Sequence, residues 1–553
     1  MNDRRVGTGL PSIWTAAFAG IVTLFAAVAV SFATRQSIWT DEATQLSGLS
    51  LNFADQLRWL TGGLPHVFAV PPDRTPPMSY WLGSAWLQVF GNSEMAARYL
   101  SISFSVASVI ALWAVARQFF SRRIATVSAA LLAFSPNFIV MAVEIRAYAA
   151  FLLFSTFLVY SYLKLLAARP APASLDLWTF SLSAALCSAT HFFGIVISGG
   201  AFLCLLIGYF PAASPSDGLA LARKAKWPLL FYLATFAGLV AFVISAVKNS
   251  GGGDISTSAA GVPLSAHLHD LVKLIYRFFG HESMLGITGL SAAALIAGVS
   301  LVVFAAIPGS NPRARQLGLF LLVNLLLVSF IDLTTHAFKA FSATYNVWAL
   351  PVTALLAAAA LTHGNRNIRI ASGVCILVIA AADGYAALRL ATAGEIYGHT
   401  RTSIVRSAVE SAGASNVVIL YGNDAPSIYF ALMYDFSGQL RQFIDRGSTV
   451  ELVGPPATRY SSKICDLSAG TLLVADDSEL SAEALKFLAT HPDVHTEAYQ
   501  ALNKFLDIHR AEIAGKWTLV SQNEYIAQSA LALAVFKSRP GAESPSSGGC
   551  YRP

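Results

Sequence analysis

Apolar positions along the chain gather into long runs separated by short polar segments. About eleven runs have membrane-spanning length: residues 10–34, 95–118, 123–142, 147–166, 176–190, 192–210, 227–248, 284–307, 316–335, 345–363 and 369–391. Because an α-helix rises about 1.5 Å per residue, roughly 20 apolar residues cross the hydrocarbon core of a bilayer. The pattern therefore predicts an all-α polytopic membrane domain of about eleven transmembrane helices. The first run is longer than a signal-peptide core, and we interpret it as an uncleaved signal anchor.

After residue 391 the pattern changes to short β-rich runs at 417–421, 471–475 and 530–536, with a helix-like stretch at 481–490. This alternation predicts a small C-terminal α/β soluble domain over residues 392–540, following the membrane domain of residues 1–391. Residues 541–553 are rich in Pro, Gly and Ser, which is typical of a disordered tail. Cys465 and Cys550 lie in this region, and the sequence leaves open whether they form a disulfide or stay free thiols.

The loop between the first two runs, residues 35–94, is long and aromatic. Trp39, Trp59, Tyr80, Trp81 and Trp86 alternate there with short apolar stretches. This pattern predicts amphipathic helices that lie in the membrane interface. The stretch 264–279 has the same character.

Composition excludes most soluble functions. Of the 553 residues 55% are hydrophobic and only 12% are charged, against roughly 25% in an ordinary soluble domain. The net charge of +6 could suggest nucleic acid as a partner, but the basic residues are spread over short loops instead of one face. We therefore expect contact with membrane lipid and no nucleic-acid binding.

The basic residues occupy every second loop. They are Arg4, Arg5, Arg117, Arg122, Arg123, Lys164, Arg169, Arg223, Lys224, Lys226, Arg313, Arg315, Arg366 and Arg369. Lys and Arg near helix ends are retained in the cytoplasm. This alternation predicts an N-terminus inside, an odd number of helices, and a C-terminal domain outside.

Several ionisable residues lie on the predicted outer side, where the rule for basic loops does not explain their presence. Asp41 and Glu42 directly follow the first run, and adjacent carboxylates at a membrane boundary cost desolvation energy unless a reacting group or cation uses them. A solvated pair at the interface is the alternative. Asp73 and Arg74 precede Pro76 and form either a local ion pair or a charged element of a site.

A third charged element is Glu144-Ile145-Arg146-Ala147-Tyr148, which stands where two apolar runs meet outside. An arginine at a helix end can extend its side chain toward water, and this would explain Arg146 alone. The same reason explains Glu144 less easily.

In this order the three elements resemble the type C glycosyltransferase superfamily, specifically the bacterial relatives of protein O-mannosyltransferases and of the lipid A aminoarabinose transferase. The resemblance covers residues 10–391. Its motifs are Trp39 to Ala43, Pro76-Pro77-x-x-Tyr80 through Phe90-Gly91-x-x-Glu94-x-x-x-Arg98, Glu144-x-Arg146-x-Tyr148 and, more weakly, Thr190 to Gly194 and Tyr345 to Pro351.

The resemblance implies transfer of a sugar from a polyprenyl-phosphate carrier to a hydroxyl of a lipid, glycan or protein acceptor. Transfer would take place by inverting direct displacement at the outer face of a bacterial inner membrane. It assigns Asp41, with Glu42 beside it, as the catalytic carboxylate. The leaving phosphate needs cations, and the outward candidates are Arg74, Arg146, Lys339 and His336. We expect the substrate pocket to comprise Glu144, Tyr148, Tyr80, His191 and Tyr345.

The chain departs from the family pattern at two positions. Thr75 stands where relatives often have His or Lys, and Thr344 stands where they commonly have Arg. Arg74 could replace the first cation, and Lys339 or His336 the second. Donor specificity stays open for this reason.

Three alternative interpretations of the sequence remain: a metal site, a transporter and an inactive scaffold. Among the histidines predicted outside, only His267-x-His269 has compact ligand spacing, but on a helix its imidazoles would point apart, so no metal is predicted and the cofactor is unknown. A transporter or flippase of a lipid-linked sugar would place ionisable groups at mid-membrane depth, whereas here they gather at one face. An inactive membrane scaffold would have no use for the carboxylate of Asp41.

Overall fold

The structure is a computed structural model. It describes residues 13–36, 38–64, 72–73, 75–169, 172–209, 215–249, 264–279, 289–335, 341–392, 416–420, 449–453, 472–479, 484, 487–488, 490–491, 494–508, 510, 513–514, 517–526 and 529–539. Contacts divide the chain into two compact units. The helical unit comprises Met1–Thr34, Asn52–Leu64 and Arg74–Ala393, and the sheet unit comprises Arg35–Leu51, Pro65–Asp73 and Gly394–Pro553. The domain limits at residues 391 and 540 stay a prediction.

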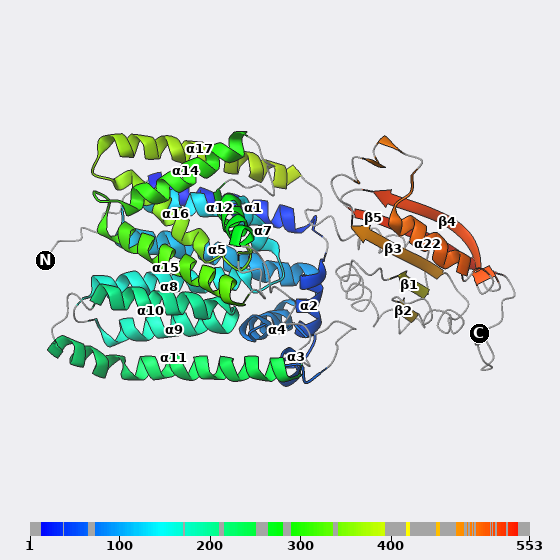
Figure 1. The fold of residues 1–553 in the computed structure, drawn as a ribbon, viewed down its shortest axis with the longest axis horizontal. Helices are drawn as coiled ribbons and strands as arrows, with labels where there is room; N and C mark the ends of the chain where they lie inside the picture. The colour runs from blue at the N-terminus through cyan, green and yellow to red at the C-terminus, as the bar shows by residue number, and fades with distance from the viewer. Residues whose placement is uncertain are drawn as a thin grey trace. The chain divides into compact units, whose positions relative to one another are not determined.

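The helical unit is a bundle of apolar helices (Figure 1). Its helices are α1 (Ile13–Ala33), α3 (Phe53–Leu60), α4 (Met78–Phe90), α5 (Glu94–Phe119), α6 (Arg122–Ala133), α7 (Pro136–Val143), α8 (Tyr148–Ala167), α9 (Ser174–Thr190), α10 (Phe193–Tyr209), α11 (Pro215–Asn249), α12 (Leu264–Phe279), α14 (Gly289–Ala306), α15 (Pro312–Thr335), α16 (Ala349–Ala359), the 3-10 turn η1 (Ala360–Thr362) and α17 (Arg366–Thr392). Each predicted apolar run lies on one of these helices or on an adjoining pair.

Within the described residues, seven helices are long and apolar enough to cross a membrane, and eight if the bent pair α6 and α7 forms one span. Helix α10 and the segment formed by α16 and η1 are shorter apolar helices. The predicted polytopic all-α membrane domain is confirmed. The chain is a multi-pass membrane protein.

The predicted run 123–142 is not one straight helix, because α6 and α7 meet at an angle of 64°. Pro136 is the first residue of α7, and Ser135 before it has an extended backbone with φ −61° and ψ 122°. The ring of a proline disfavours a helical conformation in the preceding residue and supplies no N–H for a helix hydrogen bond. The bend directs the short α7 toward the turn at residues 144–147.

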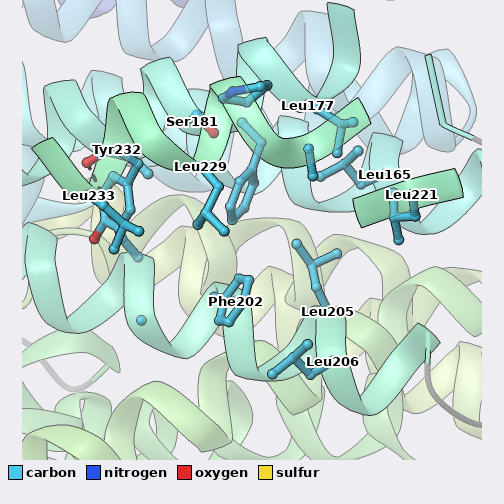
Figure 2. Close-up of a pocket in the computed structure, with 16 residues that line it drawn as sticks. Leu165, Leu177, Ser181, Phe202, Leu205, Leu206, Leu221, Leu229, Tyr232 and Leu233 are labelled. Carbon is cyan, nitrogen blue, oxygen red and sulfur yellow. Dashed lines mark hydrogen bonds between the residues drawn. The ribbon is translucent and has the colours of Figure 1, made fainter. Parts of the chain in front are cut away.

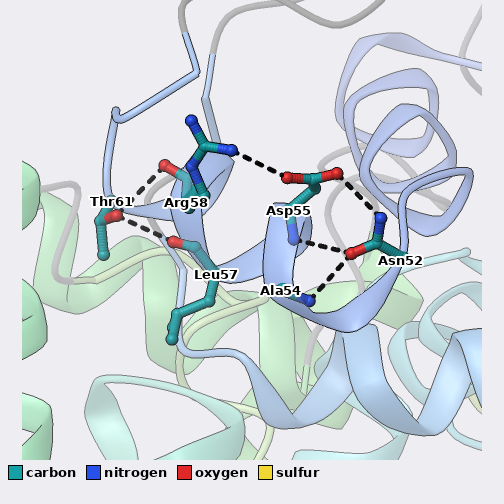
Figure 3. A network of polar contacts seen from close by, with 6 residues as sticks. All are labelled: Asn52, Ala54, Asp55, Leu57, Arg58 and Thr61. Carbon is teal, nitrogen blue, oxygen red and sulfur yellow. Dashed lines mark hydrogen bonds and ion pairs between the residues drawn. The ribbon is translucent and has the colours of Figure 1, made fainter.

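The expected helices of the first outer loop are present as α3 and α4, together with α2 (Thr40–Leu49) of the sheet unit. Figure 3 shows how α3 is capped: the Asn52 side chain accepts hydrogen bonds from the backbone N–H groups of Ala54 and Asp55. At its other end the Thr61 hydroxyl donates to the Leu57 carbonyl. Satisfying the backbone groups at both ends stabilises a helix of only eight residues.

Basic loops of the helical unit meet at one end of the bundle. Arg313 Nη1 donates to the Phe119 carbonyl over 3.0 Å, which joins the start of α15 to the end of α5. The backbone N–H of Gly364 donates to the Gly309 carbonyl over 2.9 Å, which joins the loops before α15 and α17. Loops that the charge pattern assigns to the same side of the membrane are therefore neighbours.

The sheet unit contains a five-stranded sheet in the order β2-β1-β3-β5-β4. Its strands are β1 (Asn416–Leu420), β2 (Thr449–Val453), β3 (Leu472–Glu479), β4 (Trp517–Ile526) and β5 (Ser529–Ser538). Strand β1 pairs in parallel with β2 and β3, whereas β5 runs antiparallel to β3 and β4. Helix α22 (Glu497–Ile508) packs on β3 and β5 (Figure 1).

The predicted α/β domain is therefore confirmed, with β1, β3 and β5 close to the expected runs. The sequence pattern did not predict β2, β4 or α22. Of the expected helix at 481–490, the described residues Ala484, Phe487, Leu488 and Thr490 are helical. Cys465, Cys550 and the tail 541–553 lie outside the described residues.

Candidate functional site

The turn between α7 and α8 is fixed by side chains of α5. Arg98 Nη1 donates to the Val143 carbonyl over 2.9 Å, and the Ser101 hydroxyl donates to the Glu144 carbonyl over 2.6 Å. These bonds satisfy carbonyl groups at the end of α7 that have no partner within the helix. Glu144 is 1% exposed, and Arg146 is half-buried in the same turn. The two predicted charged residues are thus held in a defined backbone conformation.

Arg98 is itself held by Glu94. Its Nε and Nη2 atoms lie 3.0 and 2.8 Å from Glu94 Oε1, and its side chain is 1% exposed. A buried guanidinium is costly unless its donors are satisfied, and here the Glu94 carboxylate and the Val143 carbonyl accept three hydrogen bonds from it. Glu94-x-x-x-Arg98 belongs to one of the sequence motifs, but the motif alone assigns the pair no role. The four-residue spacing, which places both side chains on one helix face, was the available signal.

Three predicted pocket residues from separate segments converge in an aromatic cluster, which we define as Tyr148, Phe151, His191, Phe193 and Tyr345. The His191 ring stacks on Phe151 with centroids 4.8 Å apart. It lies 5.3 Å from the Tyr345 ring and 6.1 Å from the Tyr148 ring. The cluster joins the start of α8, the turn between α9 and α10, and the segment before α16.

One hydrogen bond indicates the tautomer of His191: the Phe193 backbone N–H donates to its Nδ1 atom over 3.2 Å. A nitrogen that accepts a hydrogen bond carries no proton, so the neutral ring is assigned the tautomer with its proton on Nε2. The ring can therefore donate a hydrogen bond from Nε2 within an aromatic surrounding.

The turn that carries His191 requires glycine at position 194. A Cβ atom there would lie 2.1 Å from the Cys187 carbonyl oxygen. Because the obstructing atom belongs to the backbone of α9, no side-chain rotation can relieve the contact. Gly194 thus allows α10 to start directly beside the last turn of α9.

Tyr80 is fully buried and packs edge-on against Trp59, with ring centroids 5.8 Å apart. Close by, the Gln56 amide donates to the Ser84 hydroxyl. These contacts join α3 to α4. The structure gives the predicted pocket residue Tyr80 a packing role between two helices of the first outer loop.

Asp41 and Glu42 occupy the first turn of α2 in the sheet unit. The Trp39 backbone N–H donates to Glu42 Oε2 over 3.4 Å, so the Glu42 carboxylate reaches back to the residue before the helix. Glu42 is 1% exposed, whereas Asp41 is only partly buried. Of the two carboxylates, Glu42 has a helix-capping role and Asp41 is the more accessible.

Three predicted phosphate ligands, Arg74, His336 and Lys339, lie outside the described residues. Over the part of the chain that the structure describes, no group of three or more His, Cys, Asp or Glu side chains could hold a metal ion. His267 is buried and contacts Asp332 of α15, while His269 is exposed on the same helix. As expected for alternate residues of a helix, the two imidazoles face different surroundings.

The fold is that of the type C glycosyltransferases, which confirms the predicted resemblance. Residues 74–212 match the family model described as dolichyl-phosphate-mannose-protein mannosyltransferase. A search of curated proteins finds no significant match.

Among solved structures, the chain is similar to ArnT from Cupriavidus metallidurans bound to undecaprenyl phosphate. The TM-score is 0.52 at 12% sequence identity, over 95% of this chain and 98% of that chain. ArnT from the same organism in the apo state gives a TM-score of 0.50 at 13% identity, over 94% and 98% of the two chains. At these identities the comparison establishes the fold, and the chemistry must be argued from the residues.

Proposed function

We propose that this protein is a membrane glycosyltransferase that moves a sugar from a polyprenyl-phosphate carrier to an acceptor hydroxyl at the outer face of the membrane. The observation that carries the proposal is the convergence of Tyr148, His191 and Tyr345 in one cluster of a chain with this fold. Tyr148 also adjoins the fixed turn of Glu144 and Arg146. Separate segments therefore supply polar and aromatic groups to one place, as a substrate site requires.

In the proposed reaction Asp41 is the general base. Its carboxylate takes the proton of the acceptor hydroxyl while the acceptor oxygen attacks the anomeric carbon. The bond between that carbon and the phosphate oxygen breaks on the opposite face, so configuration is inverted and polyprenyl phosphate leaves. The proton on Asp41 then passes to water.

The leaving phosphate needs cations and hydrogen-bond donors. Arg146 offers a planar guanidinium suited to a phosphate monoester, and Arg74, Lys339 and His336 are the further candidates from the sequence. In the aromatic cluster, His191 Nε2–H and the tyrosine hydroxyls combine apolar rings with polar groups that suit a sugar. We assign Glu144 to the pocket as well, because its turn is the part of the site that α5 fixes.

We further propose that the N-terminus is inside, that the C-terminal domain is outside, and that the membrane is the bacterial inner membrane. Two features support this orientation. Basic loops meet at one end of the bundle, where the positive-inside rule predicts the cytoplasm. The turn at 144–147 and His191 stand at the other ends of α8 and α9. Partners in this proposal are the lipid-linked donor, a lipid, glycan or protein acceptor, and membrane lipid.

The decisive test compares Asp41→Asn with Glu42→Gln. Asp41→Asn keeps the size of the side chain but removes the proton acceptor, so transfer should fall about 10²–10⁴-fold. Glu42→Gln keeps an oxygen for the Trp39 N–H and should reduce transfer much less. The assay follows labelled sugar from a polyprenyl-phosphate donor to acceptor in reconstituted membranes. Wild-type turnover by Asp41→Asn would refute the mechanism and favour a transporter of the lipid-linked sugar.

A further inference from the structure

An apolar pocket of about 270 Å³ lies among α8, α9, α10 and α11 of the helical unit. Figure 2 shows side chains from these helices surrounding it, including Leu177 of α9, Phe202 of α10 and Leu229 of α11. Its lining is almost wholly aliphatic and aromatic. A cavity of this kind is poorly suited to water and favours an apolar occupant.

On α8 and α9 the pocket lies away from the aromatic cluster, whereas on α10 its lining residue Ser198 is five residues beyond Phe193 of the cluster. On α8 it is lined by Leu165, whereas the cluster contains Tyr148 at the start of that helix. At 1.5 Å per residue these positions are separated by about 25 Å along the helix axis. On α9 the pocket reaches from Leu177 to Ala184, and His191 lies beyond the end of the helix. The pocket is therefore a separate feature from the proposed transfer site.

Cationic side chains stand beside the pocket on α11. Leu221, Ala225, Pro228 and Leu229 face it. Lys224 is three residues from Leu221 and four from Pro228, so it lies at the edge of the same helix face. Arg223 and Lys226 flank it, and all three cations are exposed.

Trp227 marks the depth of this region in the membrane. It is 65% exposed, and the Lys226 ammonium lies 5.1 Å from its ring centroid. Tryptophan and basic residues together are typical of the level of lipid headgroups. The residues after Trp227 that line the pocket would then lie at the level of acyl chains.

We propose that the pocket binds one acyl chain of an anionic glycerophospholipid whose headgroup phosphate contacts Lys224. The apolar lining suits the methylenes, and the charge at the pocket edge suits an anionic headgroup. This site is independent of the proposed transfer reaction, because no residue of it belongs to the aromatic cluster or to the charged turn.

Gly199 of α10 provides the sharpest test. It lines the pocket, and a Cβ atom added there would meet no heavy atom within 4 Å. Gly199→Leu should therefore place a side chain in the pocket, because its Cβ atom meets open space. Gly238→Leu is the matched control, since Gly238 is a helical glycine with equally open space that does not line the pocket.

The experiment measures lipid adducts on the full-length, delipidated protein by native mass spectrometry, with dioleoylphosphatidylglycerol and dioleoylphosphatidylcholine as probes. The wild type should bind the anionic lipid more tightly. Gly199→Leu should weaken that binding about tenfold, because it displaces several methylenes, and Gly238→Leu should leave it unchanged. Lys224→Gln should weaken binding of the anionic lipid about fivefold and leave the zwitterionic lipid unaffected, with Arg366→Gln as its control.

Equal binding by Gly199→Leu and Gly238→Leu would overturn the proposed pocket, and unchanged binding by Lys224→Gln would overturn the headgroup contact. Undecaprenyl phosphate serves as a third probe. If Gly199→Leu lowered its binding and left phosphatidylglycerol unaffected, the pocket would hold the carrier tail, and the proposal would be wrong. None of these readouts uses sugar transfer, so failure here is distinguishable from failure of the proposed function.

Discussion

The two ends of α8, α9 and α10 are built in opposite ways. At the aromatic cluster, α9 and α10 are joined by only two residues, His191 and Phe192, and the rings around His191 lie 4.8 to 6.1 Å away. Away from the cluster on α8 and α9, and from Ser198 onward on α10, these helices and α11 leave a cavity of about 270 Å³. One bundle thus holds a closely packed polar and aromatic end and an open apolar end.

This difference indicates that two regions of one membrane bundle meet different structural requirements. A site that orients a substrate needs side chains whose conformations are fixed by their neighbours. A surface that contacts lipid has no such requirement, because acyl chains can fill irregular space. We therefore expect substitutions at the packed end to cost more stability than substitutions at the open end.

Arg98→Met should have the largest effect on stability. The substitution leaves the buried Val143 carbonyl and the part-buried Glu94 carboxylate without the guanidinium. An unsatisfied buried carbonyl alone costs about 1–3 kcal/mol, and the loss of the charge pair adds to this cost. Thermal unfolding of the detergent-solubilised protein measures the loss. Arg117→Met on the same helix is the control, because Arg117 is exposed and should contribute little. Equal stability of the two variants would contradict the role given to Arg98.

Gly194→Ala should follow, with a cost of about 1–3 kcal/mol or more, because the added methyl group collides with the Cys187 carbonyl. The displaced turn should also reduce sugar transfer. Gly199→Ala on the same helix is the comparison, since its methyl group meets open space and alanine favours a helix. The thermal midpoint and the transfer rate of both variants distinguish the packed end from the open end. A Gly194→Ala protein as stable as Gly199→Ala would show that the ends do not differ.

A smaller effect is expected at His191. His191→Leu removes both the ring contacts and the acceptor for the Phe193 N–H, and it should cost about 1–3 kcal/mol at most. His191→Asn loses the ring but retains an oxygen that can accept from the N–H two residues on, so its loss should be near 0.5–1.5 kcal/mol. Thermal midpoints of the two variants separate the hydrogen bond from the ring packing. If His191→Asn is no more stable than His191→Leu, the assignment of Nδ1 as a hydrogen-bond acceptor is wrong.

Much of the fold followed from local patterns. Each long apolar run became a helix or a helix pair because its length and hydrophobicity leave few other structures in lipid. The bend between α6 and α7 was not predicted, although Pro136 was visible, because a proline alone does not show whether a helix bends or restarts. Strands β2 and β4 were not predicted, because strands are stabilised by pairing with partners that are distant in the sequence.

Local sequence motifs were enough to nominate candidate residues for a site. Tyr148, His191 and Tyr345 were selected by motif, and the alternating loop charges defined the proposed sides of the membrane. Only the tertiary structure brought these three rings together, gave Arg98 its position beside the α7–α8 turn, and placed Tyr80 in packing between α3 and α4. The physical reason is that a motif specifies chemistry over a few residues, whereas burial and ring contacts depend on helices far apart in the chain that must fill space jointly.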